Sequence, residues 1–308
     1  MTTDPERPPT WYTNPTPVVV VTHAPALTEL RACLASVAAT TVPTHLILVS
    51  NGIDISDFDD HGVTTIQLSE NRGYGHAANV GIATAIRSGH DRVALINDDL
   101  TVTPEWLKSL HKALDRADDV GAVQPKLLIR GSDPELVNSC GVTLLRNASG
   151  IDTDFGLPND PTDTEARPIE IFSGGCVLFR RDFIMSTGGF DESFFLYYED
   201  VDLAIRGADH GWSYMCVPRS VVHHTVGGTH LSSGIRHQHR EQSRLRTATR
   251  VGSLPCIARA YGRAAIRTIR YPRSELRAIA GALRFLRNDR RFRMSRRITP
   301  HPPRKQVG

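Results

Sequence analysis

The first hundred residues alternate short runs of aliphatic residues with segments that carry apolar residues at helical spacing. The aliphatic runs predict buried strands, because β-branched residues pack well inside a parallel sheet. Helical spacing is clearest where Leu27, Leu30 and Leu34 fall on one face. The predicted strands are residues 17–22, 45–49, 63–68 and 92–96. The predicted helices are residues 27–39 and 77–87. A third helix is predicted to follow Thr103, its expected N-cap.

Strands that alternate with helices in this way are typical of βαβ units, which build a mainly parallel sheet with helices on both faces. The pattern becomes irregular after residue 120, where we expect strands with a loop excursion over residues 152–167. An apolar run at residues 171–179 predicts a strand interrupted by Gly174 and Gly175. Two adjacent small residues in a strand indicate close approach of a ligand to the backbone. The predicted fold class is therefore α/β.

Polar residues follow the predicted strands at their carboxyl ends. Ser50 and Asn51 end the second strand, and Asn71 follows the third. Asp98 and Asp99 end the fourth strand. Ligands of open parallel sheets bind beyond this edge, so we expect the binding site there.

Charge divides the 308-residue chain into two unequal parts. Residues 1–222 carry 16 basic and 30 acidic side chains, whereas residues 223–308 carry 20 basic and 3 acidic ones, and together they give the net charge of +3. The chain is therefore an acidic body with an arginine-rich tail. An otherwise ordinary composition excludes a disordered or collagen-like chain. Five widely separated cysteines favour buried thiols over a disulfide framework or a zinc cluster.

The tail contains a candidate amphipathic helix. Its apolar stripe is Leu276, Ile279, Ala280, Leu283 and Leu286, and Arg277, Arg284, Arg287 and Arg290 lie off that stripe. Basic amphipathic helices bind anionic membrane surfaces, which is the interaction we expect here. Packing of the helix on the acidic body is one alternative. A nucleic-acid patch is disfavoured, because few aromatic residues lie among the arginines to stack on bases.

The amino-terminal lead, residues 1–16, is polar and rich in proline and has no apolar core of a signal peptide. The longest apolar stretch is far shorter than the ~18 residues that a membrane-spanning helix needs. We therefore expect a cytoplasmic protein that meets the membrane only at its surface.

Asp98 and Asp99 are candidates for metal chemistry. Two carboxylates at a strand end suit Mg²⁺ or Mn²⁺ bridging phosphates, because hard cations prefer oxygen ligands. The alternative is that an Asp caps the next helix and that the pair lies in a solvated turn. His223 and His224 end a later predicted strand, where an imidazole can complete such a site or be merely structural.

A second acidic group, Glu199-Asp200-x-Asp202, follows a run of aromatic residues. Apolar surroundings raise the pKa of a carboxyl group and suit it to act as a general base. The alternative is that these acids stabilise a helix N-terminus and that Asp202 pairs with Arg206 four residues later.

The segment Gly73-x-Gly75-x-x-Ala78 lies between a predicted strand and a predicted helix, with acidic residues some twenty positions later. This spacing matches the dinucleotide-binding fingerprint and raises the alternative of an NAD(P)-dependent oxidoreductase. A complete βαβ unit precedes the segment, however, and amides flank it at Asn71 and Asn79. An equal use for these groups is to approach a nucleotide diphosphate.

Taken in order, these motifs resemble the family 2 glycosyltransferases, in particular their single-addition, rhamnosyltransferase-like branch. The resemblance covers roughly residues 17–230 and implies a GT-A fold with a nucleotide-sugar half over residues 17–120 and an acceptor half over residues 121–235. Residues 236–308 would be a basic helical extension. The matching segments are 19–22 (VVVT), 49–51 (VSN), 70–81 (ENRGYGHAANVG), 95–100 (LINDDL), 172–181 (FSGGCVLFRR), 188–203 (GGFDESFFLYYEDVDL) and 221–224 (VVHH).

The resemblance also implies roles for individual residues. Asp99 and His223 would bind a divalent cation, Mg²⁺ or Mn²⁺, with His224 the less favoured ligand. Asp200 would be the base that deprotonates the acceptor hydroxyl for direct, inverting displacement. The expected nucleotide-sugar-binding residues are Thr22, Asn51, Asn71, Gly73, Asp98, Gly174 and Gly175.

One departure concerns the donor base. The family usually has Asp where this chain has Ser50, and that Asp commonly recognises a pyrimidine. The Gln-x-x-Arg-Trp motif of processive synthases is absent, so we expect one sugar per visit. The expected function is transfer of a sugar, rhamnose from dTDP-rhamnose or the sugar of a UDP-sugar, to a lipid-diphosphate or cell-envelope glycan acceptor. The alternatives are the oxidoreductase and a non-catalytic binding relative.

Overall fold

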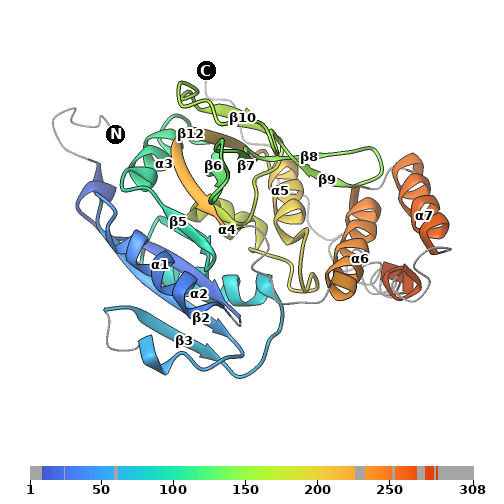
Figure 1. Cartoon of the computed structure of the whole chain (residues 1–308), viewed down its shortest axis with the longest axis horizontal. Coiled ribbons are helices and arrows are strands. Elements are labelled where there is room, and N and C mark those ends of the chain that lie inside the picture. Colours follow the sequence, from blue (N-terminus) through green and yellow to red (C-terminus); the bar gives the residue numbers. More distant parts are fainter. Residues whose placement is uncertain are drawn as a thin grey trace, which may run out of the picture. The chain divides into compact units, whose positions relative to one another are not determined.

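The computed structural model describes residues 9–23, 25–58, 62–225, 233–251, 254–268, 275–280 and 282–283. Its contacts divide the chain into two compact units (Figure 1). The main domain comprises Met1–Leu145 and Ser149–Ser232, and the C-terminal extension comprises Arg146–Ala148 and Ser233–Gly308.

The main domain is built on a ten-stranded mixed sheet. Four parallel strands form one side of it, β1 (Thr16–Thr22), β2 (Thr44–Asn51), β3 (Thr64–Leu68) and β4 (Arg92–Asn97). The sheet continues through β11 (Cys176–Arg180), which is antiparallel to β4, and then through β6 (Val120–Ile129), β12 (Ser213–His224) and β10 (Arg167–Ile169). Two short strands pair at its margin, β5 (Leu100–Val102) with β12 and β7 (Val137–Ser139) with β6, and β8 (Val142–Leu144) and β9 (Gly150–Asp152) form a separate hairpin.

Helices cover both faces of this sheet, because successive residues of a strand point to opposite sides. Val18 and Val20 of β1 join one core and Val19 and Val21 join the other. The first core is completed by α1 (Leu27–Ala38) and α3 (Trp106–Leu114), and the second by α2 (Tyr74–Arg87), α4 (Arg181–Thr187) and α5 (Glu199–Asp209). Two short 3₁₀ turns, Thr10–Tyr12 and Ser56–Phe58, complete the domain.

The sheet and the helices confirm the predicted α/β class, and three local predictions are corrected. The predicted strand at 171–179 begins only at Cys176, so the paired glycines precede β11 and do not interrupt it. Helix α2 starts at Tyr74, three residues earlier than expected. Thr103 is not the N-cap of α3, because its hydroxyl donates to the Val221 carbonyl (3.0 Å) and the helix starts at Trp106.

All five cysteines are buried thiols, as predicted. Cys33 and Cys176 lie in the first core, and Cys140 and Cys216 lie in a small cluster beside Leu128. Cys256 is buried within the extension.

The extension contains α6 (Ser233–Val251), α7 (Leu254–Thr268) and helical residues 275–280 and 282–283. The apolar stripe predicted for membrane contact is not the face that packs inside the extension. Ala278 and Ala282 are buried, whereas Leu276 and Leu283 are 57% and 52% exposed. Leu286, Arg284, Arg287 and Arg290 lie outside the described residues. No helix in the described part of the chain is both long enough and apolar enough to cross a membrane.

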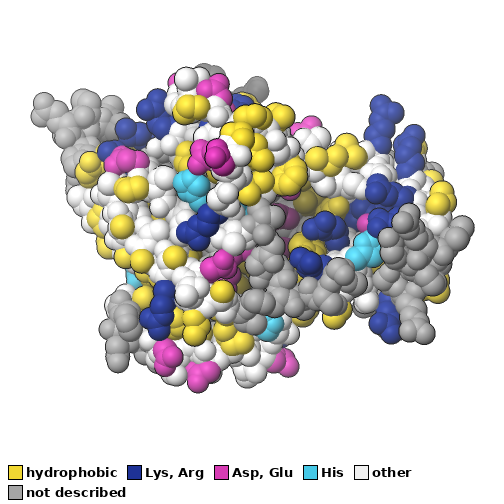
Figure 2. Space-filling view, viewed as in Figure 1, with side chains coloured by type: hydrophobic (Ala, Val, Ile, Leu, Met, Phe, Trp, Pro, Cys, Tyr) yellow, Lys and Arg dark blue, Asp and Glu magenta, His cyan; other side chains and the backbone are white. Residues whose placement is uncertain are grey.

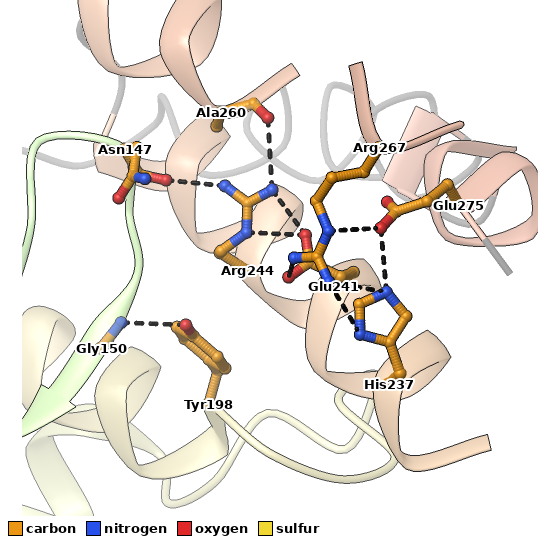
Figure 3. Close-up of polar contacts among 9 residues, drawn as sticks. All are labelled: Asn147, Gly150, Tyr198, His237, Glu241, Arg244, Ala260, Arg267 and Glu275. Atoms are coloured by element: carbon orange, nitrogen blue, oxygen red, sulfur yellow. Dashed lines mark hydrogen bonds and ion pairs between the residues drawn. The ribbon is translucent and has the colours of Figure 1, made fainter. Parts of the chain in front are cut away.

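Ion pairs hold the inside of the extension together (Figure 3). Arg244, only 1% exposed, donates to Glu241 Oε2 (2.7 and 3.0 Å) and to the Asn147 and Ala260 carbonyls. Arg267 of α7 reaches both Glu241 (3.1 Å) and Glu275 (3.1 Å). His237 lies 2.9 Å from Glu275 Oε1. Breaking one member of such a buried pair is costly, because its partner keeps an uncompensated charge.

Candidate active site

The carboxyl ends of β1 and β4 and the end of β12 bring Thr22, Asp98, Asp99 and His224 together at one edge of the sheet. The Thr22 hydroxyl donates to Asp98 Oδ2 over 2.6 Å. The end of β12 runs antiparallel to β5, so that His224 is opposite Leu100 and the Thr225 N–H donates to the Asp99 carbonyl (3.1 Å). Pairing between these strands therefore brings a histidine to the acidic pair.

That histidine is His224, which corrects the prediction of His223. His224 Nε2 lies 3.3 Å from Asp99 Oδ2. Neighbouring residues on a strand point to opposite faces, and His223 contacts Glu135 Oε1 instead (3.1 Å). His224 Nδ1 is 2.7 Å from Asn138 Oδ1, an oxygen that only accepts hydrogen bonds. Nδ1 therefore carries the proton, and Nε2 is the nitrogen directed at the carboxylate.

The chemistry of this group fits a divalent cation. Asp99 Oδ1 is buried and has no hydrogen-bond partner among the described residues. An imidazole whose Nδ1–H is held by Asn138 is arranged as metal-binding histidines usually are. Burial raises the pKa of Asp98 to about 6, with the Thr22 hydrogen bond acting in the opposite direction and the Asp99 charge adding to the increase. A nearby cation would favour the ionised form of both carboxyl groups.

Protein ligands alone do not complete a metal site here. Within the described ranges, no group of three or more His, Cys, Asp or Glu side chains is placed to hold an ion. Mg²⁺ commonly binds through one or two carboxylates together with substrate phosphates. Asp99 and His224 would therefore hold a cation together with the phosphate oxygens of a bound substrate.

Asp200, the candidate general base, lies in the first turn of α5. Its Oδ2 accepts the Gly174 N–H (2.7 Å) and its Oδ1 accepts the Val201 N–H (2.8 Å). Burial raises its pKa, although both hydrogen bonds favour the charged form. The chain enters this helix through Tyr197 and Tyr198, each with φ of +67°, a strained conformation for a residue with a side chain.

Gly174 and Gly175 connect the two acidic groups. The Gly174 N–H binds Asp200, and the Gly175 carbonyl accepts the Asn97 N–H (2.9 Å) directly before Asp98. A Cβ at Gly174 would lie 3.1 Å from the Asp200 Cβ, so the position has little room for a side chain. The close approach predicted at these glycines is therefore made by Asp200 itself.

Glu199, beside Asp200, belongs to the same predicted acidic group. Its side chain is buried, and its Oε2 has no hydrogen-bond partner in the part of the chain that the structure describes. Burial and then the neighbouring Asp200 charge raise its pKa to about 8. The pairing predicted for Asp202 is confirmed, because Asp202 Oδ2 accepts Arg206 Nε–H over 2.8 Å.

The amides predicted to line the nucleotide bind one another. Asn51 Nδ2 donates to Asn71 Oδ1 (2.9 Å) and to the Gly73 carbonyl (3.2 Å). The Gly73 N–H donates to Asn71 Oδ1 (2.9 Å). These bonds fix the backbone before α2. Ser50 forms a local turn instead, where its hydroxyl accepts the Ile53 N–H (3.0 Å).

The glycine-rich loop approaches protein backbone. A Cβ at Gly73, where φ is +99°, would lie 2.6 Å from the Phe195 carbonyl oxygen. A Cβ at Gly75 would lie 3.1 Å from the Phe190 Cβ, and Ala78 is fully buried. The glycines therefore make room for the segment that leads to Asp200, which explains their spacing without a dinucleotide.

The family model described as "Glycosyltransferase like family 2" matches residues 15–244. The chain belongs to glycosyltransferase family 2. N-acetylglucosaminyl-diphospho-decaprenol L-rhamnosyltransferase of Mycobacterium tuberculosis is 31% identical over 245 residues, which cover 70% of this chain and 78% of that one. The O-antigen biosynthesis protein RfbC of Myxococcus xanthus is 30% identical over 167 residues, which cover 52% of this chain and 13% of RfbC.

Among solved structures, the crystal structure of GalNAc-T7 with UDP, GalNAc and Mn²⁺ aligns with a TM-score of 0.60 at 15% identity. The alignment covers 76% of this chain and 47% of that one, so this chain spans about half of GalNAc-T7. At this identity the likeness concerns the fold, and it confirms the GT-A architecture. The family 2 protein is a glycosyltransferase, and the oxidoreductase interpretation of the Gly73–Ala78 loop is wrong.

Replacing His224 should weaken cation binding, whereas replacing His223 should not. We expect His224→Ala to lower the affinity for Mn²⁺ in the presence of UDP by about tenfold or more, because a nitrogen ligand is lost. His223→Ala is the matched control on the adjacent, opposite-facing position. Electron paramagnetic resonance of titrated Mn²⁺ measures both, and equal loss in the two variants would contradict the assignment to His224.

Glu199→Gln should flatten the pH dependence of stability. Because the folded-state pKa is raised from 4.5 to about 8, the folded protein holds a proton that the unfolded chain releases between these values. The stability contributed by this group is present below pH 4.5 and is lost as pH rises toward 8. Glu199 should contribute up to about −1.4 kcal/mol per pH unit to the wild-type slope, and Glu199→Gln should remove this contribution while those of Asp98 and Asp200, whose pKa values are also raised, remain.

Urea unfolding at a series of pH values measures this slope. Glu70→Gln, at an exposed position outside the site, is the control and should leave the slope unchanged. A Glu199→Gln protein with the wild-type slope would show that Glu199 is ionised in the folded state.

Proposed function

We propose that the protein is an inverting, non-processive glycosyltransferase that moves rhamnose from dTDP-rhamnose to a lipid-diphosphate-linked glycan. The rhamnosyltransferase of M. tuberculosis, whose name specifies an N-acetylglucosaminyl-diphospho-decaprenol acceptor, supports the sugar and the acceptor class. The observation that carries the proposal is the link through Gly174 and Gly175 between Asp200 and the Asp98–Asp99 pair. One carboxylate is thereby available as a base and the other two face a diphosphate.

In the proposed reaction, the acceptor hydroxyl attacks the anomeric carbon of the donor. Asp200 takes the hydroxyl proton, the new C–O bond forms, and the bond to the diphosphate oxygen breaks with its electron pair leaving on the nucleoside diphosphate. The burial that raises the pKa of Asp200 makes it a stronger base than an exposed aspartate. Attack opposite the leaving group inverts the configuration.

Asp99 and His224 would hold a divalent cation, Mg²⁺ or Mn²⁺, and Asp98 would lie beside the ribose or diphosphate. The cation would supply positive charge that stabilises the leaving diphosphate. Thr22 orients Asp98 through its 2.6 Å hydrogen bond. Asn51, Asn71 and Gly73 would contribute the shape of the nucleotide site, because their polar groups fix the loop before α2.

Asp200→Asn should abolish transfer and keep donor binding. Loss of a positioned general base lowers kcat by about 10²- to 10⁴-fold, and the amide keeps the shape of the carboxylate. Rates come from a radiolabelled-sugar transfer assay, and donor binding from calorimetric titration of dTDP, UDP and GDP with and without Mn²⁺. Asp209→Asn, at the exposed carboxyl end of α5, is the control. Retained turnover in Asp200→Asn would contradict the base assignment, whereas absence of transfer by the wild-type protein would favour the non-catalytic alternative.

The proposed acceptor places the protein at the cytoplasmic face of a membrane, and the extension is the surface we assign to this contact. The surface of the extension includes the exposed leucines Leu276 and Leu283 and the exposed arginines Arg259 and Arg277. Basic side chains crowd the surface of the extension in Figure 2. Apolar insertion combined with attraction to anionic headgroups is the usual basis of such binding.

Point variants test this contact better than deletion, because removing α7 would also remove Arg267 from its two carboxylates. The double variant Arg259→Gln/Arg277→Gln should bind phosphatidylglycerol-containing vesicles about fivefold more weakly per arginine, from the ~1 kcal/mol that each contributes near an anionic surface. Arg31→Gln/Arg87→Gln removes the same charge from exposed positions of the main domain. Equal sedimentation of both double variants with vesicles would contradict the membrane role of the extension.

A further inference from the structure

A polar cavity lies on the main domain between α3 and β12, outside the candidate active site. Its volume is about 390 Å³, within the range of small-ligand sites. Four basic side chains line it, Lys108, Lys112, Arg116 and Arg219, with Glu105 as the one carboxylate among its lining residues. Lys108 is paired with Glu105 over 3.0 Å. The remaining lining therefore carries a surplus of positive charge.

This surplus is unusual for its surroundings. Residues 1–222 have 16 basic and 30 acidic side chains, and four of the 16 basic ones line this single cavity. Lys112, Arg116 and Arg219 are exposed, so neither packing nor burial accounts for their gathering. Like charges brought together in the absence of a partner repel one another, and an anion bound among them would remove that repulsion.

The local structure fixes the cationic groups on opposite walls. Lys108 and Lys112 are one helical turn apart on α3, and Arg116 follows just beyond the end of the helix. Arg219 lies where the pairing of β12 with β6 shifts register between Val217 and Val221. An irregularity of this kind re-aims a side chain. The next residue, Ser220, anchors the strand to α3 by donating to the Trp106 carbonyl (2.9 Å).

The third wall is the loop of residues 160–166, in which the Asp160 and Asp163 side chains are already bonded and the exposed Glu165 is not among the lining residues. The buried Lys126 donates to the Asp160 carbonyl (3.0 Å), and the Asp160 carboxylate accepts the Thr162 N–H and hydroxyl. Asp163 is paired with Arg167. The loop presents Thr164 and Ala166 to the cavity, so these carboxylates do not neutralise its cations.

We propose that this cavity binds a phosphate ester or diphosphate at a site separate from the active site. Guanidinium and ammonium groups on two walls match the several oxygens of a phosphate group. Ala113, Ala166 and Val217 supply a small apolar floor on which the carbon part of an ester can rest. Val217 lies seven residues before His224 on β12, which separates the two sites by roughly 20 Å at about 3.3 Å per residue.

The ligand has two chemical sources, a phospholipid headgroup or a soluble phosphate compound. The first would give the main domain its own contact with a membrane, and the second would make the cavity an effector site. Neither depends on the identity of the donor or the acceptor proposed above.

Lys112→Gln/Arg219→Gln tests the site on the full chain, since both residues are exposed and their loss should leave the fold intact. Sodium diphosphate is titrated calorimetrically with EDTA present, which removes cation-dependent binding at Asp99 and His224. We expect the double variant to bind diphosphate about tenfold more weakly than wild type, from the loss of two charge-assisted contacts. Arg31→Gln/Arg87→Gln is the charge-matched control and should bind as wild type does.

A second arm measures sedimentation with phosphatidylcholine vesicles that contain or lack phosphatidylglycerol. Weaker binding of the cavity variant to the anionic vesicles, relative to the control, supports a lipid headgroup as the source. A change confined to the diphosphate titration supports a soluble phosphate compound. Identical behaviour of cavity and control variants in both arms would overturn the proposal, whatever the transfer activity of the protein.

Discussion

The candidate site depends on two adjacent glycines whose backbone groups join its halves. At Gly174 the backbone N–H holds Asp200 from the second half of the chain, and at Gly175 the carbonyl holds the end of β4. The space beside Gly174 is filled by the Asp200 side chain, so a side chain at this position would press on the carboxylate. The proposed displacement needs its base and its leaving-group site at a fixed separation, and these two hydrogen bonds on neighbouring residues help to set it.

Much of the fold follows from the sequence because the β1–β4 region obeys a simple rule. Aliphatic runs that alternate with helical spacing can bury both faces only as a parallel sheet covered by helices. The same rule predicts that Asp98 and Asp99 end a strand at the ligand-binding edge. It is weaker for residues 121–180, where β11 runs antiparallel between β4 and β6 and the periodicity is short.

The remaining features depend on long-range pairing, which a sequence does not display. The choice between His223 and His224 is set by the register of β12 against β5. The hydrogen bond from Asn51 to Asn71 joins side chains twenty positions apart. The raised pKa of Glu199 needs burial by elements distant in the chain. The sequence predicts where the motifs lie along the strands, whereas the direction of each side chain is set by the tertiary structure.

Fewer arginines of the extension are available to partners than its sequence suggests, because Arg244 and Arg267 form ion pairs with carboxylates inside the extension. These ion pairs also limit where the protein can be shortened. A protein shortened to the family-matching residues 15–244 would end inside α6, at the arginine that the Ala260 carbonyl helps to hold. Glu241 would lose Arg267, and the new carboxyl terminus would add a negative charge beside it. Such a fragment should aggregate or be proteolysed even though every catalytic motif is retained.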